Sequence, residues 1–249
     1  MIDQEKKKLL SLLPSLIDST FLQDEEVLLQ KFITEHKDCF ERNSDKKPAS
    51  ICSYPRFLPI LQNEFHNYSL VYTSVTPSFP SHDDNHHALI RWGEHTRDTG
   101  VSELDIVLNP SFIYDQNKRN TFKELCKELK KIFPCLKVII ETGVLQSAER
   151  IISACTLCLE ANVNFIKTST GKNGPGASLE HTKIILEQIN LFYGNHSLPQ
   201  TGIKVSGGVR TVQDAFSFLK QFQAINNKCE LTKESFRIGS SSLFTESLR

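Results

Sequence analysis

Short segments with strand-like composition recur eight times along this chain, and each is followed by a segment with helical periodicity. The eight strand-like segments cover residues 16–20, 49–54, 70–75, 103–108, 136–141, the stretch around Lys167, 202–206 and 236–239. Regular alternation of strand and helix over a whole chain favours a parallel sheet covered by helices. Eight such units in 249 residues predict a closed (β/α)8 TIM barrel rather than an open, doubly wound sheet.

The helical segments complete the same pattern. They are expected at residues 3–13, 24–40, 55–66, 83–99, 119–133, 146–161, 178–192 and 211–223, with a final short helix after the eighth strand. The first of them precedes the first strand and adds a short N-terminal helix to the barrel. No linker or change of composition interrupts the series, so a single barrel domain over residues 1–249 is predicted.

Composition argues against several functional classes. The 29 basic and 29 acidic residues give a formal net charge of zero, which indicates neither a nucleic acid nor an acidic membrane surface as a partner. No apolar run reaches the roughly 18 residues of a membrane span, and the charged N-terminus lacks a signal-peptide core. The seven cysteines, an odd number without a secretory signal, predict reduced thiols in the cytoplasm.

Two groups of residues have some character of a metal site. Cys155 and Cys158 form a single C-x-x-C inside a helical pattern, without the second pair that would complete a zinc site. Residues 82–87 combine histidines with aspartates, but their spacing matches no standard metal motif and fits a solvated helix start. We therefore expect no metal and no cofactor.

Strand periodicity sends ionisable side chains into the barrel. Alternate residues of a barrel strand face the axis, and the others pack beneath the helices. Because apolar residues of the fourth to seventh strands suit the helix side, the inward residues include Asp105, Lys137, Glu141, Lys167 and Lys204. Most of them lie near the C-terminal ends of their strands, where barrel active sites are built. The alternatives are a purely structural ion network and an edge strand that leaves Lys167 in water.

Lys167 and Lys204 on neighbouring strands suggest a specific chemistry. Neighbouring strands lie about 4.8 Å apart, and two like charges about 5 Å apart repel by roughly 3 kcal/mol at an effective dielectric constant near 20. This repulsion lowers one lysine pKa by roughly two units, so that amine is partly neutral and can attack a carbonyl carbon. The resulting Schiff base is the electron sink needed to make or break an adjacent carbon–carbon bond. Asp105 can then move protons, directly or through water.

Three glycine-containing loops follow the sixth, seventh and eighth strands. They read Gly171-Lys172, Gly207-Gly208-Val209-Arg210 and Gly239-Ser240-Ser241-Ser242. Glycine lets backbone N–H groups approach a phosphate, and the helix N-termini behind such loops favour negative charge. Barrels often bind phosphate after strands seven and eight. Ordinary turn chemistry explains some of these glycines but not their clustering, so the loops predict a phosphate site.

Seven segments combine these residues, in order, along nearly the whole chain. They read LIDST (16–20), ICSYPRF (51–57), ELDIV (103–107), KVIIET (137–142), FIKTSTGK (165–172), KVSGGVRT (204–211) and RIGSSS (237–242). The set resembles one family, the 2-deoxyribose-5-phosphate aldolases, which are class I, Schiff-base aldolases. The segments at 165–172 and 207–211 are highly specific for it.

The resemblance implies a (β/α)8 barrel and a reversible, metal-independent lyase reaction. In this reaction 2-deoxy-D-ribose 5-phosphate is cleaved to acetaldehyde and D-glyceraldehyde 3-phosphate. By the family's pattern Lys167 forms the Schiff base, Lys204 lowers its pKa, and Asp105 relays protons with Lys204 through water. The family's substrate-binding positions match residues near the sugar hydroxyls, in the pocket and in the phosphate site: Asp18, Thr20, Cys52, Gly171, Lys172, Gly207, Gly208, Val209, Arg210, Gly239, Ser241 and Ser242.

The family also suggests a role in deoxyribonucleotide breakdown. The partners it implies are small molecules, a sugar phosphate and acetaldehyde. The sequence leaves the oligomeric state open, with a homodimer as the candidate assembly.

Two features depart from the family pattern. Members often carry a C-terminal tail ending in tyrosine, which assists proton transfer at the acetaldehyde carbon, whereas this sequence ends at Leu248-Arg249. Either the chemistry is slower or differently assisted, or Asp105 with water suffices. The loop at 173–176 is also richer in glycine and proline than expected, which leaves its closure over a phosphate open.

Two other functions share parts of this pattern. A transaldolase-like or ketose-phosphate aldolase would keep the lysine and the phosphate loops but prefer a donor other than acetaldehyde. A catalytically silent barrel would bind a phosphorylated metabolite without turnover. The combination of Asp105, Lys167 and Lys204 disfavours the silent barrel.

Overall fold

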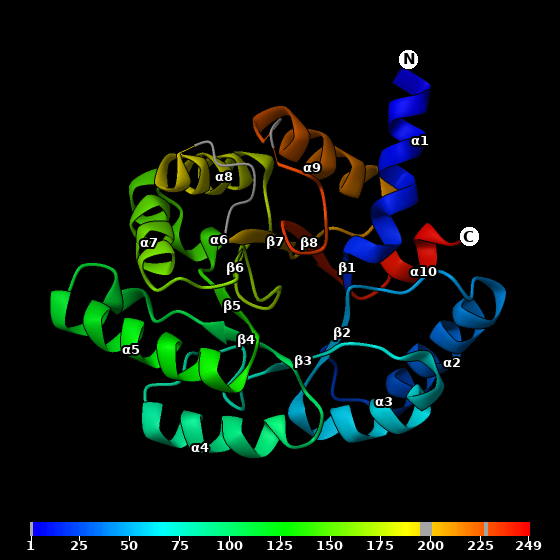
Figure 1. Cartoon of the computed structure of the whole chain (residues 1–249), viewed down its shortest axis with the longest axis horizontal. Helices are drawn as coiled ribbons and strands as arrows, with labels where there is room; N and C mark the ends of the chain where they lie inside the picture. Colours follow the sequence, from blue (N-terminus) through cyan, green and yellow to red (C-terminus); the bar gives the residue numbers. More distant parts are fainter. Residues whose placement is uncertain (1, 195–200, 227–228) are drawn as a thin grey trace.

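Eight parallel strands close into a barrel in the order β1 to β8 (Figure 1). The computed structural model describes residues 2–194, 201–226 and 229–249. The strands are β1 (Ile17–Phe21), β2 (Ser50–Ser53), β3 (Tyr72–Val75), β4 (Glu103–Val107), β5 (Cys135–Ile139), β6 (Phe165–Lys167), β7 (Gly202–Ser206) and β8 (Phe236–Ser240). The predicted (β/α)8 barrel is thus confirmed, with every expected strand present.

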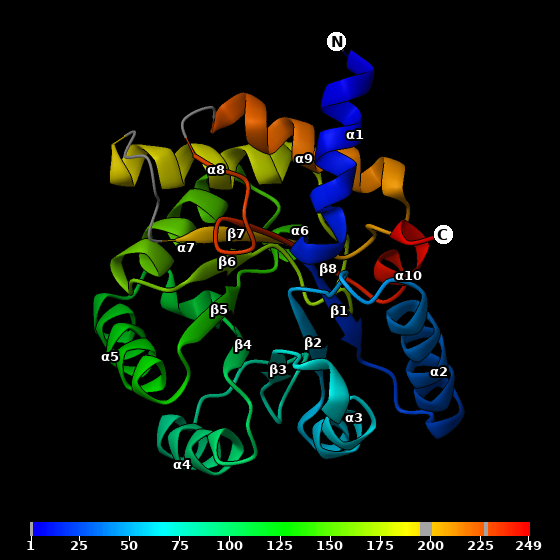
Figure 2. The ribbon, with the colours of Figure 1, turned by 45° about the vertical axis from the view of Figure 1, so that its right-hand side comes forward.

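Helices surround the strands on the outside (Figures 1 and 2). They are α1 (Ile2–Leu12), α2 (Glu26–Arg42), α3 (Leu58–Glu64), α4 (His86–Arg97), α5 (Gln116–Ile132), α6 (Thr142–Leu145), α7 (Ala148–Glu160), α8 (Leu179–Tyr193), α9 (Val212–Ile225) and α10 (Leu243–Ser247). Short 3-10 helices lie at η1 (Leu13–Leu16), η2 (Pro55–Phe57), η3 (His66–Tyr68) and η4 (Pro110–Phe112). The N-terminal α1 packs beside α9 and extends past the barrel (Figure 2).

Three helical details differ from the expectation. The segment expected as one helix at 55–66 is divided into η2 and α3. Helix α4 begins at His86 rather than near residue 83, because the Asn85 side chain accepts a hydrogen bond from the Ala88 N–H and caps the helix there. The one-turn helix α6 was not expected, and it begins at Thr142, directly after the residue at which the fifth strand was expected to end.

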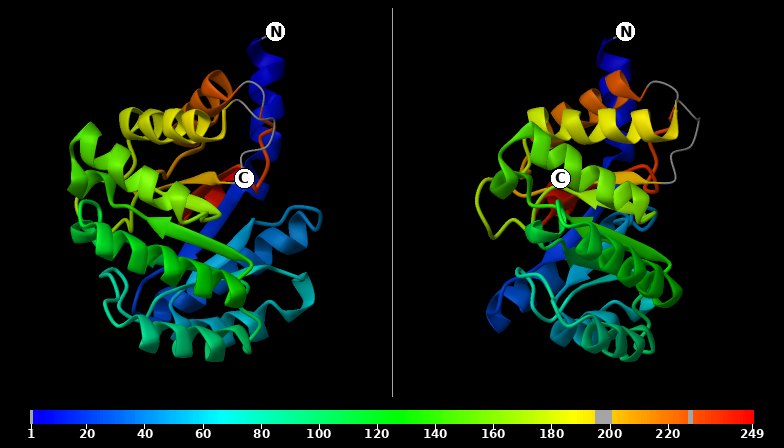
Figure 3. Two further views of the ribbon diagram at one scale, coloured as in Figure 1. Left: turned by 60° about the vertical axis from the view of Figure 1, so that its left-hand side comes forward. Right: turned by 90° about the vertical axis from the view of Figure 1, so that its left-hand side faces the viewer.

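Strand register places the inward residues of neighbouring strands at matching heights. Asp105 pairs with Lys137 across β4 and β5, and Lys167 pairs with Lys204 across β6 and β7. The alternate residues of these strands, such as Ile106, belong to the apolar layer beneath the helices. The two views of Figure 3 show this helical layer around the strands. In the described part of the chain, no helix combines the length and apolarity needed to cross a membrane.

Candidate active site

Seven charged side chains fill the barrel interior, and each is at most 5% exposed. This charged cluster consists of Asp18, Glu103, Asp105, Lys137, Lys167, Lys204 and Arg237. Burial of a charged group is costly unless it is paired and hydrogen-bonded. The inward orientation predicted for Asp105, Lys137, Lys167 and Lys204 is therefore what the structure shows.

Asp105 on β4 is the centre of the cluster. Its Oδ2 accepts hydrogen bonds from Lys167 Nζ and from Lys204 Nζ, both at 2.8 Å, and its Oδ1 accepts one from Lys137 Nζ at 3.0 Å. Burial opposes ionisation of Asp105, but the three ammonium groups outweigh it and hold the pKa of this carboxyl well below its usual range. Asp105 is therefore ionised, and its Oδ2 accepts a hydrogen bond from both lysines of the predicted pair, Lys167 and Lys204.

The two lysines of that pair differ in pKa. Burial, assisted by the positive charge of Lys204, lowers the pKa of Lys167 against the opposing effect of Asp105. Burial also disfavours the charged form of Lys204, but Asp105 and Asp18 outweigh it and raise the pKa of Lys204 to about 12. Repulsion between like charges was the expected cause of the lowered pKa. In the structure, loss of hydration is the larger contribution.

A second layer of charges lies beside this group. Arg237 on β8 donates from Nη1 and Nη2 to the Glu103 carboxylate at 2.7 and 2.9 Å, and from Nη1 to Asp18 Oδ1 at 2.9 Å. Asp18 Oδ2 lies 2.6 Å from Lys204 Nζ, which joins the two layers. Asp18, expected near the substrate hydroxyls, is fully buried in these ion pairs. Arg237 was not among the predicted site residues, although strand alternation places it on the same face as Gly239.

Lys167 opens onto a cavity of about 260 Å³ at the mouth of the barrel. This mouth cavity is lined by Thr20, Leu22, Gln23, Lys167, Thr170, Gly171, Lys172, Ser206, Gly207, Gly208, Val209, Arg210, Gly239, Ser240 and Ser241. Among the described residues, its walls contain basic side chains and glycine-rich backbone but no carboxylate. Such a lining suits an anion with a reactive carbonyl at the other end. Of the residues assigned to substrate by resemblance, Asp18, Cys52 and Ser242 are not in this lining.

The loop that joins β6 to α8 forms one wall of the mouth cavity. A side chain at Gly176 would collide with the carbonyl of Gly207, and one at Gly143 would collide with the carbonyl of Pro175. Backbone therefore packs against backbone on both sides of the loop, which only glycine permits. Lys172 Nζ also donates to the carbonyl of Leu22 at 2.7 Å. The glycines and proline at 173–176 thus pack the loop against its neighbours.

Glu141 holds the same loop through hydrogen bonds to Thr170. It was expected inside the barrel as part of the fifth strand, but β5 ends at Ile139 and Glu141 adopts a left-handed conformation (φ 51°). Its carboxylate accepts hydrogen bonds from the Thr170 N–H at 2.6 Å and the Thr170 hydroxyl at 2.8 Å. The Thr170 hydroxyl oxygen accepts from the N–H of Lys172 at 3.1 Å. Glu141 therefore fixes the loop, rather than joining the charged cluster.

An apolar cluster lies beside Lys167. It comprises Leu22, Cys52, Val75, Phe79 and Ile139. The Phe79 ring centroid lies 6.0 Å from Lys167 Nζ. Burial raises the pKa of the Cys52 thiol, which keeps it protonated. This wall suits the small apolar end of a substrate, and it shields one side of the lysine from water.

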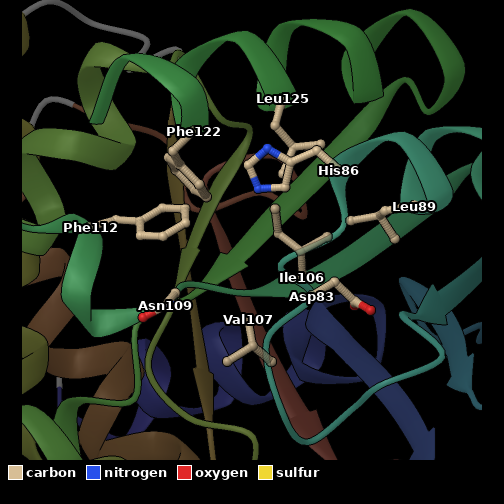
Figure 4. A pocket seen from close by; sticks show the side chains of 9 residues that line it. All are labelled: Asp83, His86, Leu89, Ile106, Val107, Asn109, Phe112, Phe122 and Leu125. Atoms are coloured by element: carbon tan, nitrogen blue, oxygen red, sulfur yellow. The ribbon is translucent and has the colours of Figure 1, made fainter. Parts of the chain in front are cut away.

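The structure describes no group of three or more His, Cys, Asp or Glu side chains that could hold a metal ion, over residues 2–194, 201–226 and 229–249. The His and Asp residues of the 82–87 segment lie outside the barrel. Figure 4 shows Asp83 and His86 beside a cavity of only about 10 Å³, with Phe112 and Phe122 around the imidazole. Ile106 points into this space while Val107 points to the opposite side of β4 (Figure 4). This cavity is therefore separate from the lysine site.

Comparison with known proteins finds the same barrel fold in several solved structures. No family model matches the sequence. A protein described as a deoxyribose-phosphate aldolase from Toxoplasma gondii ME49 has a TM-score of 0.80 at 18% identity, covering 98% of this chain and 96% of its own. One from Coccidioides immitis has a TM-score of 0.72 at 24% identity, covering 96% and 86%.

A third solved structure has the same fold over the full length of this chain. The deoxyribose phosphate aldolase from Aeropyrum pernix, described as a unique tetramer, has a TM-score of 0.71 at 18% identity and covers 100% of this chain and 97% of its own. At these identities the likeness establishes the barrel, and the chemistry has to be argued from the site.

Proposed function

We propose that this protein is a deoxyribose-phosphate aldolase, a class I lyase that reversibly cleaves 2-deoxy-D-ribose 5-phosphate to acetaldehyde and D-glyceraldehyde 3-phosphate. One observation supports this most directly. Lys167, whose pKa is lowered by burial, shares a carboxylate oxygen with charged Lys204 and opens onto a cavity with basic walls. A nucleophilic amine, a proton relay and an anion site are thus adjacent.

The first half of the reaction forms the Schiff base. The neutral amine of Lys167 attacks the aldehyde carbon C1 of the open-chain sugar, and a carbinolamine results. Loss of water then gives the protonated imine. The departing hydroxyl takes a proton from Lys204, which Asp105 Oδ2 holds beside Lys167, either directly or through a water molecule.

The second half breaks the carbon–carbon bond. The C3 hydroxyl loses its proton through water to the Asp105–Lys204 pair, and the C2–C3 bonding electrons move into the imine to form an enamine. The fragment that contains carbons C3 to C5 leaves as glyceraldehyde 3-phosphate. Protonation of the enamine at C2 and hydrolysis release acetaldehyde and regenerate the Lys167 amine. The apolar cluster beside Lys167 suits the two-carbon fragment.

The phosphate belongs at the other end of the mouth cavity. Backbone N–H groups of the Gly207–Gly208 loop, with the cations Lys172 and Arg210, supply the complementary groups. A cytoplasmic role in deoxyribonucleotide breakdown follows from this reaction as part of the proposal. A homodimer remains our proposed assembly.

Borohydride trapping tests the proposal. The protein is incubated with acetaldehyde and borohydride, and the reduced adduct is located by peptide mass mapping. We expect a two-carbon adduct on Lys167 and cleavage of deoxyribose 5-phosphate. The Lys167→Ala variant should give no adduct, and exposed Lys183 on α8 serves as a matched control, because Lys183→Ala should keep both activities.

The possible outcomes separate the remaining functions. No adduct, in a folded protein that still binds sugar phosphates, would favour the silent binding barrel. An adduct on Lys167 without cleavage of deoxyribose 5-phosphate would indicate an aldolase with another substrate.

A further inference from the structure

We propose that Glu103 and Arg237 are positioning residues that set the protonation state of Lys167 through the charge balance of the buried cluster. The inference rests on the proposed function only in taking Lys167 as the nucleophile. Arg237 forms ion pairs with Glu103 and Asp18, and Lys167 forms its ion pair with Asp105. Among the described residues Arg237 and Lys167 form no ion pair with each other, so Arg237 acts on Lys167 electrostatically and over a distance.

The cluster contains one cation more than it has carboxylates. Asp18, Glu103 and Asp105 supply three negative charges, whereas Lys137, Lys167, Lys204 and Arg237 supply four positive charges when all are protonated. An uncompensated buried charge is costly. Loss of one proton makes the cluster neutral, so one of its cations is expected to be deprotonated.

Contacts identify Lys167 as the cation that loses the proton. Lys204 lies within 2.8 Å of two carboxylates, and Arg237 lies within 2.9 Å of two. Lys137 is 2.7 Å from Glu103 and 3.0 Å from Asp105. Lys167 has one carboxylate partner, Asp105, which it shares with two other lysines.

The remaining surroundings of Lys167 do not change this balance. Cys52 on β2 has its pKa raised by burial and is a neutral thiol, and Phe79 presents a ring. Lys204 on β7 repels the ammonium form of Lys167, and Asp105 on β4 attracts it. Lys167 also lines the mouth cavity, so its proton has a route to solvent.

The balance predicts opposite effects for two substitutions. Arg237→Met removes one cation, so Lys167 is needed as the third positive charge and its pKa rises. Glu103→Gln removes one carboxylate, so the pKa of Lys167 falls further. For a unit charge about 8 Å away at an effective dielectric constant of about 20, the pKa changes by about one to two in each case. The double variant Glu103→Gln/Arg237→Met keeps the charge balance and should titrate like the parent protein.

Competitive labelling with acetic anhydride measures the Lys167 pKa without requiring turnover. Labelling of Lys167 is followed against pH by peptide mass spectrometry, with exposed Lys183 as the internal reference and circular dichroism to check folding. We expect the titration to move to higher pH in Arg237→Met, to lower pH in Glu103→Gln, and to return in the double variant. Arg237→Lys keeps the charge and should leave the titration in place.

The inference would be overturned if Lys167 titrated as in the parent protein in both folded single variants, or if its pKa shifted in the same direction in both. If the single variants do not fold, a folded double variant whose Lys167 titration differs from that of the parent protein by about one pH unit or more would overturn it as well. Opposite shifts of Lys167 in a protein without aldolase activity would support the charge balance and refute the proposed function, so the two failures are distinguishable.

Discussion

The charged cluster inside the barrel and the mouth cavity above it meet at Lys167, yet they are built differently. The cluster is made of side chains from strands, each held by ion pairs and at most 5% exposed. The mouth cavity is made largely of loop backbone, with glycines where one segment packs on another. The difference indicates that the two regions have separate roles. The cluster sets the reactivity of the amine, and the cavity sets which molecule reaches it.

The largest effect is expected for the loss of the Lys167 amine, which should abolish the chemistry while leaving substrate binding in place. Lys167→Ala should lower turnover by at least about 1,000-fold, because the covalent step loses its nucleophile. A sugar phosphate should still bind, since the loops and basic groups of the cavity are unchanged. Turnover and calorimetric binding of the phosphate ligand measure the two effects. Near-normal activity in this variant would show that the nucleophile lies elsewhere.

Lys204→Leu tests whether the cluster sets the pH dependence. Removing this cation takes away a charge that repels the ammonium form of Lys167. It also frees the Asp105 carboxylate from its ion pair with Lys204, so Asp105 stabilises the Lys167 ammonium more strongly and the pKa of Lys167 rises. Only the neutral amine attacks, so activity present above that pKa is lost as pH falls through it, and the acidic limb moves to higher pH. A rise of about one in the pKa lowers the rate on that limb about tenfold. An unchanged pH–rate profile would contradict the assigned role.

Lys172→Gln and Arg210→Gln test the cavity. A charge-assisted hydrogen bond contributes about 1.5–3 kcal/mol, so each substitution should raise KM for the phosphorylated sugar by about 10- to 100-fold. The pH profile should stay in place, and cleavage of unphosphorylated deoxyribose should be little affected. Lys183→Gln on α8 is the matched control. A shifted pH profile in the cavity variants would mean that the two regions are not separable.

Glu141→Ala should give the smallest change. It leaves the N–H and hydroxyl of Thr170 without their acceptor and loosens the loop that presents Lys172. We expect KM to rise by about tenfold, the equivalent of about 1.4 kcal/mol, with an unchanged pH profile. Glu141→Gln, which keeps one acceptor oxygen, should recover part of the loss. Equal effects of the two substitutions would show that Glu141 does not act through Thr170.

Local patterns were sufficient to predict most of the barrel. Strand alternation depends on each residue's own backbone, so it placed Asp105, Lys137, Lys167 and Lys204 in the interior from a few residues of context. It was wrong for Glu141, because the end of β5 is decided by the turn into α6 and by the hydrogen bonds to Thr170. Arg237 could have been found by extending the same alternation to the eighth strand.

The sequence by itself determined the eight-unit barrel, the inward lysines and the glycine loops after the last strands, since each is a property of a short segment. Only the tertiary structure decided which charges meet. Closure of the barrel pairs β8 with β1, and so brings Arg237 to Asp18 across 219 positions of sequence. Pairing of distant strands sets how many carboxylates each cation contacts, and therefore leaves Lys167 as the amine with the fewest.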